Sequence, residues 1–220
     1  ETYRQLLANV QPADSAAVRS YVYQRFIKDY LRMVDVLDEN VGRLLDRVEA
    51  DPELRDNTVI VYASDQGYFT GEHGYAEKRL MYEEAMHMPL LVRWPGRIRG
   101  DTRIEALVQN IDLAPTLLDV AGVPIPSAMQ GLSLLPLLDG EPPADWRTSV
   151  YYHYYDHGQH RVGRHAGVRT DRYKLIHFYE VGTWELFDLK TDPQEMRSVY
   201  EEAEYAAVRE EMAKELERLR

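Results

Sequence analysis

The stretch "NTVIVYASDQGYFTGEHGYAEKRLMYEEAMHMPLLVRWPG", residues 57–96, holds two strand-like runs separated by a polar, glycine-rich segment. Thr58 to Tyr62 are β-branched or aromatic, which is typical of a strand buried on both faces. The run 88–96 predicts a second such strand, which Pro95 and Gly96 end. Ligands of open parallel sheets bind beyond the carboxyl ends of strands. The segment 63–79, "ASDQGYFTGEHGYAEKR", is therefore the predicted position of a functional site.

The flanking sequence predicts helices and strands in alternation. Apolar side chains recur every three or four residues over 21–49, which predicts an amphipathic helix, and Asp51-Pro52 predicts a turn. The stretch "ALVQNIDLAPTLLDVAGV", residues 106–123, predicts a short strand followed by a helix over about 111–121. This order is typical of an α/β fold with a mostly parallel sheet and helices.

The composition changes near residue 140. The stretch "GEPPADWRTS", residues 140–149, reads as a linker or a subdomain boundary. Beyond it, runs rich in tyrosine and β-branched residues predict short antiparallel strands, at 149–155, about 165–170, 172–178 and 183–189. The charged tail from Glu201 predicts a helix. We expect two domains: an α/β part over 1–140, and a small antiparallel sheet with a C-terminal helix over 141–220.

The charge balance restricts the class of partner. The 220 residues contain 26 Lys and Arg against 37 Asp and Glu, a formal net charge of −11. This balance argues against non-specific binding of nucleic acid, and no apolar run approaches the roughly 20 residues that span a bilayer. The absence of cysteine excludes disulfides and zinc-thiolate sites within these residues.

The segment 63–79 carries groups suited to a cation and an anion. The Asp65 carboxylate and the Gln66 amide oxygen are hard donors of the kind that Ca²⁺ or Mg²⁺ prefers, whereas zinc favours imidazole or thiolate. Lys78 could place a compact positive charge against an anionic oxygen, and His73 could exchange a proton near neutral pH. In the plainer interpretation, Asp65 caps a helix and the glycines only form a loop.

Several motifs in one order resemble those of type I sulfatases in the alkaline-phosphatase-like superfamily. The main one is "SDQGYFTGEHGYAEKRLMYEEAMHMPLLVRWPG", and "IDLAPTLLDVAGVPIPSAMQGLSLLPLL", "HAGVRTDRYKLIHFY" and "WELFDLKTDPQEMRSVY" follow it. The similarity is greatest to iduronate-2-sulfatase and bacterial glycosaminoglycan sulfatases, and it covers most of the chain. It implies the C-terminal part of a sulfatase that acts on a sulfated carbohydrate.

The resemblance also implies roles for particular residues. Asp65 and Gln66 match the second pair of calcium ligands, and Lys78 matches a catalytic lysine that contacts the sulfate. His73 lies in the G-E-H-G element and is a catalytic candidate, although it could equally be a loop-packing histidine.

His165 is expected to bind substrate, with a surface histidine at a strand end as the alternative. Glu83 and Glu84 are expected to fix the loop by local hydrogen bonds, and Arg169 is expected to be structural.

The nucleophile of the family is a formylglycine made within a C/S-x-P-x-R signature, and these 220 residues contain no such signature. The first Asp pair of the calcium site is also absent. We therefore expect a C-terminal fragment that is inactive alone and binds Ca²⁺ weakly or not at all, since Ca²⁺ takes six to eight oxygen ligands. Its expected partner is a missing N-terminal half or a second copy in a homo-oligomer.

Two other functions stay open at this point. A phosphonate monoester hydrolase or phosphodiesterase of the same superfamily is one, although such enzymes commonly show Asp-His where this chain has Asp65-Gln66. A non-catalytic assembly or sugar-binding module is the other. The compartment is unknown from the residues, and the resemblance implies the periplasm or secretion.

Overall fold

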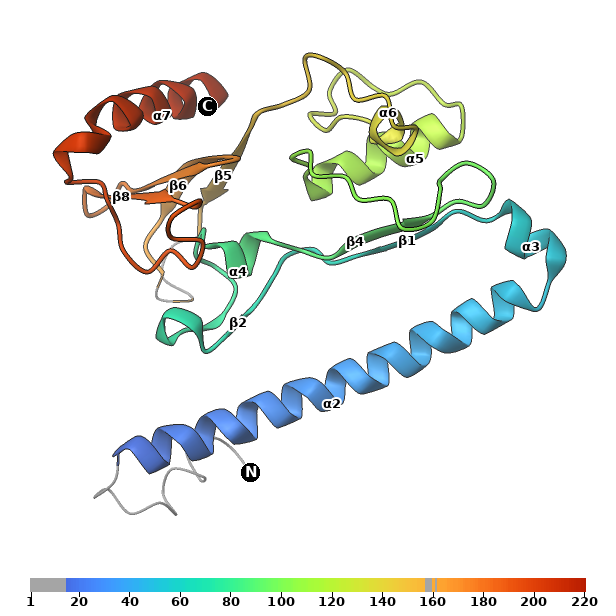
Figure 1. The fold of residues 1–220 in the computed structure, drawn as a ribbon, viewed down its shortest axis with the longest axis horizontal. Coiled ribbons are helices and arrows are strands. Elements are labelled where there is room, and N and C mark those ends of the chain that lie inside the picture. The colour runs from blue at the N-terminus through green and yellow to red at the C-terminus, as the bar shows by residue number, and fades with distance from the viewer. Residues whose placement is uncertain (1–14, 157–159, 161) are drawn as a thin grey trace. The chain divides into compact units, whose positions relative to one another are not determined.

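The computed structural model describes residues 15–156, 160 and 162–220 (Figure 1). The chain divides into two compact units. The first comprises Glu1–Val59 and Thr70–Ala76, and the second comprises Ile60–Phe69 and Glu77–Arg220. The expected domain boundary at residue 140 falls inside the second unit and stays a prediction.

The first unit contains a long helix. Helix α2 (Ser15–Glu49) confirms the expected amphipathic helix and begins earlier than the apolar pattern suggested. The expected turn at Asp51-Pro52 is instead the start of a further helix, α3 (Pro52–Asn57). The Asp51 carboxylate caps α3 by accepting the backbone N–H of Glu53 and Leu54, and Pro52 suits the first helical position because it lacks an N–H.

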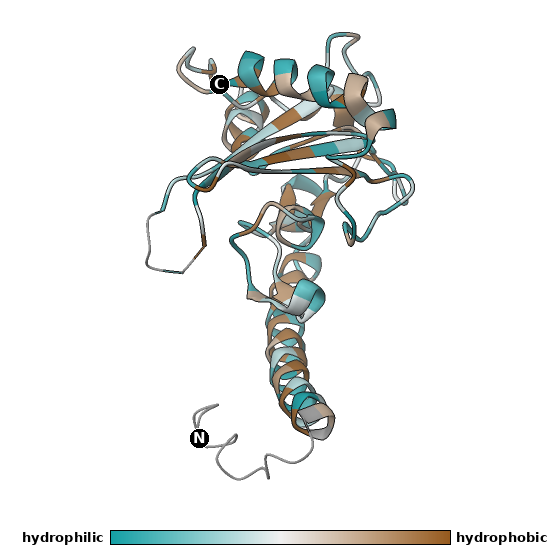
Figure 2. Cartoon of the chain, turned by 90° about the vertical axis from the view of Figure 1, so that its left-hand side faces the viewer, coloured by the Kyte–Doolittle hydropathy of each residue, from teal (hydrophilic) through white to brown (hydrophobic). Residues whose placement is uncertain are grey.

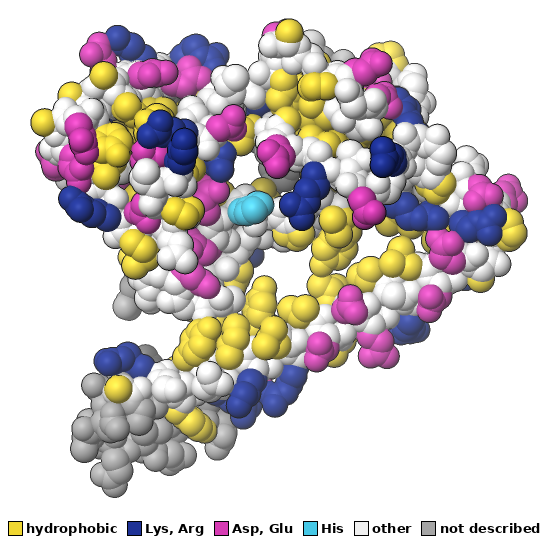
Figure 3. Space-filling model, viewed as in Figure 1, with side chains coloured by type: hydrophobic (Ala, Val, Ile, Leu, Met, Phe, Trp, Pro, Cys, Tyr) yellow, Lys and Arg dark blue, Asp and Glu magenta, His cyan; other side chains and the backbone are white. Residues whose placement is uncertain are grey.

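Helix α2 carries a stripe of exposed apolar side chains, which Figure 3 shows along one side of the helix. Leu44 is 70% exposed and Met33 is 64% exposed. The stripe also includes Val34, Leu37 and Leu45, whereas the exposed Leu31 and Val36 lie on other sides of the helix. Apolar surface of this extent is unusual on a monomeric soluble protein and marks a contact face.

The two central strands are present but pair in the opposite sense to the one expected. Strands β1 (Ile60–Ala63) and β4 (Leu90–Arg93) are antiparallel, with Ile60 opposite Arg93. The prediction of a mostly parallel sheet is therefore wrong for this pair. A long connection, residues 64–89, permits either direction, so the connection could not decide the question. The strands are also not buried on both faces, since Leu91 is 66% exposed.

Between β1 and β4 the chain forms short elements: strand β2 (Phe69–Thr70), the 3₁₀ turn η1 (Glu72–Gly74), strand β3 (Ala76–Glu77) and helix α4 (Glu83–Met86). After β4 come η2 (Asn110–Asp112), α5 (Leu113–Val120) and α6 (Leu135–Leu138). The segment 106–109, where a short strand was expected, contains none. The fully buried Asp112, the last residue of η2, directly precedes α5 and forms an ion pair with Arg147.

The small antiparallel sheet is confirmed. Strands β5 (Ser149–Tyr154), β6 (His165–Thr170), β7 (Tyr173–Phe178) and β8 (Thr183–Asp188) pair in that order. After η3 (Ala203–Tyr205), helix α7 (Ala206–Leu219) covers one face of this sheet. Met212 and Leu216 of α7 pack on Val168, Leu175 and Leu186. Figure 2 shows hydrophilic residues on the opposite side of α7.

The other face of the sheet packs on the segment that contains α4. Met81, Tyr82 and Ala85 form a buried cluster with Ile176 and Phe187. Alternation along β7 explains this two-sided burial, because Leu175 faces α7 whereas Ile176 faces α4. The sheet therefore fixes the position of α4 within the second unit (Figure 1).

Helix α2 is the longest described helix and carries charged residues along its length. In the described part of the chain, no helix combines the length and apolar character needed to cross a bilayer.

Candidate functional site

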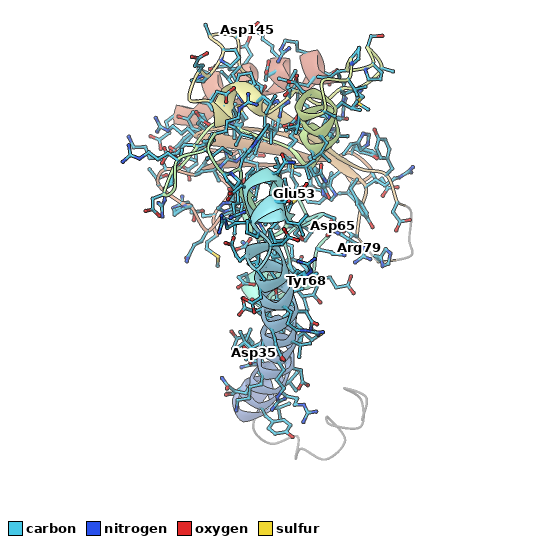
Figure 4. The ribbon with its side chains drawn as sticks, turned by 90° about the vertical axis from the view of Figure 1, so that its right-hand side faces the viewer. Asp35, Glu53, Asp65, Tyr68, Arg79 and Asp145 are labelled. Atoms are coloured by element: carbon cyan, nitrogen blue, oxygen red, sulfur yellow. The ribbon has the colours of Figure 1, made fainter. Side chains whose placement is uncertain are left out.

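Asp65 and Gln66 lie just beyond β1, with Ser64 between, as expected (Figure 4). The Asp65 Oδ1 atom accepts the Gln66 backbone N–H at 2.9 Å, and the Ser64 hydroxyl donates to the Gln66 carbonyl at 2.8 Å. These bonds fold residues 64–67 into a tight turn that leaves Asp65 exposed. Since no helix starts at this point, Asp65 is not a helix N-cap, and the plainer interpretation of this residue is wrong.

A shallow hollow opens beside this turn. It is lined by Ala63, Ser64, Asp65, Asn110, Ile111 and Leu113. Asn110 donates its side-chain N–H to the Asp65 carbonyl at 3.1 Å, so η2 helps to hold the turn. Sequence reasoning missed Asn110, because no spacing rule connects it to an aspartate that lies far before it in the chain.

The turn rests on α4. The Gly67 backbone N–H donates to the Ala85 carbonyl at 2.8 Å. A Cβ atom at residue 67 would lie 2.0 Å from the Glu84 carbonyl oxygen, so only glycine permits this approach. Gly67 therefore permits close approach of the turn to the protein's own helix α4.

The oxygen donors of Asp65 and Gln66 are of the type that Ca²⁺ prefers. Two residues are, however, too few to hold the ion. Together they offer a carboxylate and an amide oxygen, whereas Ca²⁺ takes six to eight oxygen ligands. Among the described residues, no group of three or more His, Cys, Asp or Glu side chains could hold a metal ion. Further ligands would have to come from outside this group.

Lys78 follows β3 and is half-buried. Within the described part of the chain, no hydrogen bond or ion pair joins Lys78 to Asp65 or Gln66. Leu80, two residues later, belongs to the buried cluster that packs on the small sheet, and this packing fixes the backbone that follows Lys78. The predicted sulfate contact of Lys78 stays a prediction.

His73 lies in η1, within the first unit. Its backbone is left-handed, with φ of 53°, which is an uncommon conformation for a residue other than glycine. Glu72 fixes this loop by accepting the Thr70 backbone N–H at 2.6 Å and the Thr70 hydroxyl at 2.9 Å. A strained conformation is compatible with a functional residue, and the catalytic role of His73 stays a prediction.

His165 is fully buried at the start of β6, so the alternative of a surface histidine is wrong. Its ring lies between the rings of Tyr152 and Tyr154, with centroids 5.4 Å away, and close to Phe178. Nδ1 donates to the Gly163 carbonyl at 2.8 Å, and burial lowers the pKa of the ring. Burial favours the neutral imidazole, and the Gly163 carbonyl holds a proton on Nδ1. The substrate contact of His165 stays a prediction.

Glu83 makes long-range contacts, not the local hydrogen bonds that were expected. It forms ion pairs with Lys174 at 2.7 Å and Arg169 at 3.1 Å. Burial by itself would raise the pKa of Glu83, but the two cations outweigh it and lower the pKa to about 2. Arg169, in β6, therefore has the structural role expected of it, through its ion pair with Glu83 of α4.

Two family profiles match the chain. The profile described as "Sulfatase" matches residues 3–123, and the profile "N-sulphoglucosamine sulphohydrolase, C-terminal" matches residues 71–220. Each covers more than half of the chain, and together they include Asp65, Gln66, Lys78, His73 and His165.

Curated relatives agree with these matches. An N-acetylglucosamine-6-O-sulfatase of Bacteroides thetaiotaomicron is 48% identical over 98% of this chain, which spans 39% of that protein. The N-acetylglucosamine-6-sulfatase of Homo sapiens is 43% identical over 56% of this chain, which spans 22% of that protein. The chain thus spans well under half the length of these two relatives.

Solved structures share the fold. One is described as a complex with its substrate D-glucosamine-2-N,6-O-disulfate and matches 98% of this chain and 43% of its own, with 48% identity and a TM-score of 0.90. A phosphonate monoester hydrolase from Silicibacter pomeroyi matches 96% of this chain and 43% of its own, with 27% identity and a TM-score of 0.82. The α/β architecture with a small antiparallel subdomain and a C-terminal helix is thereby confirmed. The chain belongs to the sulfatase family.

Proposed function

We propose that the whole protein is a sulfuric ester hydrolase that removes sulfate from a sulfated glucosamine. The observation that carries the proposal is the 48% identity over 98% of this chain to an N-acetylglucosamine-6-O-sulfatase, with Asp65, Gln66 and Lys78 inside the matched region. The fragment status, the substrate and the partners belong to this proposal, since the chain spans 39% of that relative.

In the proposed mechanism the chain supplies charge and positioning. Asp65 and Gln66 would hold Ca²⁺ together with ligands from elsewhere in the whole protein, and the bound cation would neutralise charge on the sulfate oxygens. Lys78 would stabilise the same oxygens as negative charge develops on them. His73 would give a proton to the leaving alcohol, and His165 would help to bind the sugar. A formylglycine would be the nucleophile, from outside these 220 residues.

The reaction class can be tested on the whole protein with three substrates, two of which are aryl esters. We expect turnover of 4-nitrophenyl sulfate and of N-acetylglucosamine-6-sulfate to exceed that of bis(4-nitrophenyl) phosphate by a wide margin. The reverse preference would favour a phosphonate monoester hydrolase or phosphodiesterase, for which the fold match to the Silicibacter enzyme is the supporting observation.

The role of Lys78 can be tested in the same assay. We expect Lys78→Ala to lower kcat by about 10²-fold or more, because a preorganised cation next to the reacting anion is removed. Lys214→Ala is the matched control, since Lys214 lies on α7 with its side chain 75% exposed. Full activity of Lys78→Ala would remove Lys78 from the mechanism.

The family resemblance also leads us to propose a periplasmic or secreted location for the whole protein. Cell fractionation with an enzymatic marker for each compartment tests it. Recovery of the protein with cytosolic markers would overturn this part of the proposal.

A further inference from the structure

Four charged side chains meet where β6, β7, α4 and the turn after β8 come together. Lys174 Nζ lies 2.7 Å from a carboxylate oxygen of Glu83 and 2.7 Å from one of Glu195. Arg169 pairs with Glu83 from the other side at 3.1 Å. Glu83, Arg169, Lys174 and Glu195 are called the ion cluster below. Its two cations balance its two carboxylates.

Two members of the ion cluster, Lys174 and Glu195, are buried, and the other two are partly buried. Lys174 has no exposed surface, and Glu195 is 3% exposed. Glu195 also has a left-handed backbone, with φ of 52°, which costs energy in a residue with a side chain. Buried ion pairs often add little net stability compared with apolar side chains of the same size. A strained, buried arrangement of this kind therefore suggests a role in fixing one conformation.

The element that the ion cluster fixes is α4. One Glu195 carboxylate oxygen accepts the backbone N–H of Glu83 at 2.6 Å, at the first residue of α4, while the Glu83 side chain is held by Lys174 and Arg169. Helix α4 has only four residues and could not be stable by itself. Both the backbone and the side chain of its first residue are therefore held by β6, β7 and the turn at Glu195.

Helix α4 in turn holds the turn at residues 64–67. Gly67 donates its N–H to Ala85 and contacts the Glu84 carbonyl so closely that no Cβ could fit. Asp65 and Gln66, the proposed metal ligands, immediately precede this contact. A continuous series of contacts thus leads from Lys174 through α4 to the metal-binding turn, entirely within the second unit.

We propose that Lys174 and Glu195 are positioning residues for the metal-binding turn, acting through α4. This inference rests on the proposed function, because it assigns the ion cluster to the site of Asp65 and Gln66. Partners outside the metal ligands commonly change metal affinity about 10- to 100-fold when they are replaced. The ion cluster acts in the same way over a longer series of contacts.

Two variants of the whole protein test the inference. Lys174→Met removes the ammonium and keeps the side-chain length. The double variant Lys174→Met, Glu195→Gln also keeps the charges balanced, since Arg169 and Glu83 remain as a pair, so it serves if the single variant does not fold. The measurements are the dissociation constant for Ca²⁺ by titration calorimetry and amide hydrogen exchange of residues 64–67 without metal. We expect about 10-fold weaker Ca²⁺ binding and faster exchange in the folded variants.

Leu216→Ala is the matched control, because it destabilises the sheet from the α7 side without touching the ion cluster. We expect it to lower the melting temperature and to leave both readouts unchanged, and Lys174→Arg to recover part of the Ca²⁺ affinity. If Lys174→Met and the double variant both show the Ca²⁺ affinity and the amide exchange of the wild type, the inference is overturned. If the wild-type protein binds no Ca²⁺, the proposed metal site fails, and the exchange measurement alone still decides whether Lys174 positions the turn.

Discussion

At the residue scale, Glu83 shows how two opposing effects set one titration. Burial raises the pKa of a carboxyl group, and the cations of Lys174 and Arg169 lower it. The cations prevail, and the pKa of Glu83 falls from 4.5 to about 2. Burial prevails at Glu195, whose pKa is raised although the Lys174 ammonium lies beside it. Folding therefore favours the ionised form of the Glu83 carboxyl group and the protonated form of the Glu195 carboxyl group.

The lowered pKa of Glu83 predicts a loss of stability in acid. The ionised form is favoured by folding, so its contribution is fully present above about pH 4.5 and is lost as the pH falls towards 2. The contribution is on the order of 3 kcal/mol, because each pH unit of difference between the folded and unfolded pKa is worth about 1.4 kcal/mol. In Glu83→Gln, urea unfolding of the whole protein should show a smaller decrease in free energy between pH 4.5 and 2 than the wild type shows.

Glu211→Gln is the control for this measurement, because Glu211 is an exposed carboxylate on α7. It should leave the pH dependence of unfolding close to that of the wild type. An equal slope for Glu83→Gln and the wild type over the acid range would contradict the assigned ion pairs.

At the scale of elements, the small sheet is a support with two covered faces. Helix α7 packs on one face through Met212 and Leu216, and the segment with α4 packs on the other through Met81 and Tyr82. Gly167 in β6 permits this second contact, because a Cβ there would lie 2.3 Å from the Met81 sulfur. The sheet thus stabilises α4 although it contributes neither of the two proposed metal ligands.

Removal of one apolar contact of α7 should destabilise the packing of this helix on its face of the sheet, opposite to α4. Leu216 has no exposed surface, so Leu216→Ala leaves a cavity and should cost about 2 to 5 kcal/mol. Lys214→Ala, two residues earlier on the exposed side of α7, should change the free energy of unfolding by less than about 0.5 kcal/mol. Urea unfolding of the whole protein measures both, and equal stabilities of the two variants would show that α7 is not packed as described.

Sequence patterns predicted most of these elements for a clear physical reason. Alternation with a period of two places Leu175 and Ile176 on opposite faces of β7, and periods of three and four place the apolar stripe on α2. The motif around Asp65 could also be recognised in the sequence, because it lies just beyond strand β1. The direction of pairing between β1 and β4 was not visible, since it depends on contacts between residues that are distant in sequence.

The ion cluster could not be predicted for the same reason. Glu83 was expected to make local hydrogen bonds, because sequence proximity is the only guide to partners that a single sequence offers. Its partners Lys174 and Glu195 come from later parts of the chain, and only the packing of α4 on the sheet brings them within 2.7 Å of each other. The contact of Asn110 with Asp65 is a smaller example.

At the scale of the whole molecule, the 220-residue chain exposes apolar surface that a stable soluble protein normally covers. Each unit contributes to it: α2 in the first through residues such as Met33 and Leu44, and strands β1 and β4 in the second through Val61 and Leu91. Single exposed apolar residues are normal, whereas a continuous stripe indicates a contact face. The formal net charge of −11 opposes self-association without covering this surface.

We therefore expect the isolated 220-residue chain to bind the dye ANS and to self-associate, and the whole protein to do neither. Replacing Met33, Leu37 and Leu44 of α2 by Glu should reduce dye binding and association of the isolated chain, because these side chains are 64%, 50% and 70% exposed and lie in one stripe. Val181→Glu is the control, since Val181 is 75% exposed in a turn outside the stripe and should have little effect. Analytical ultracentrifugation and ANS fluorescence measure the outcome. If the isolated chain is monomeric and binds no dye, the stripe on α2 is not an accessible apolar surface. The prediction that the rest of the whole protein or a second copy covers it would then be wrong.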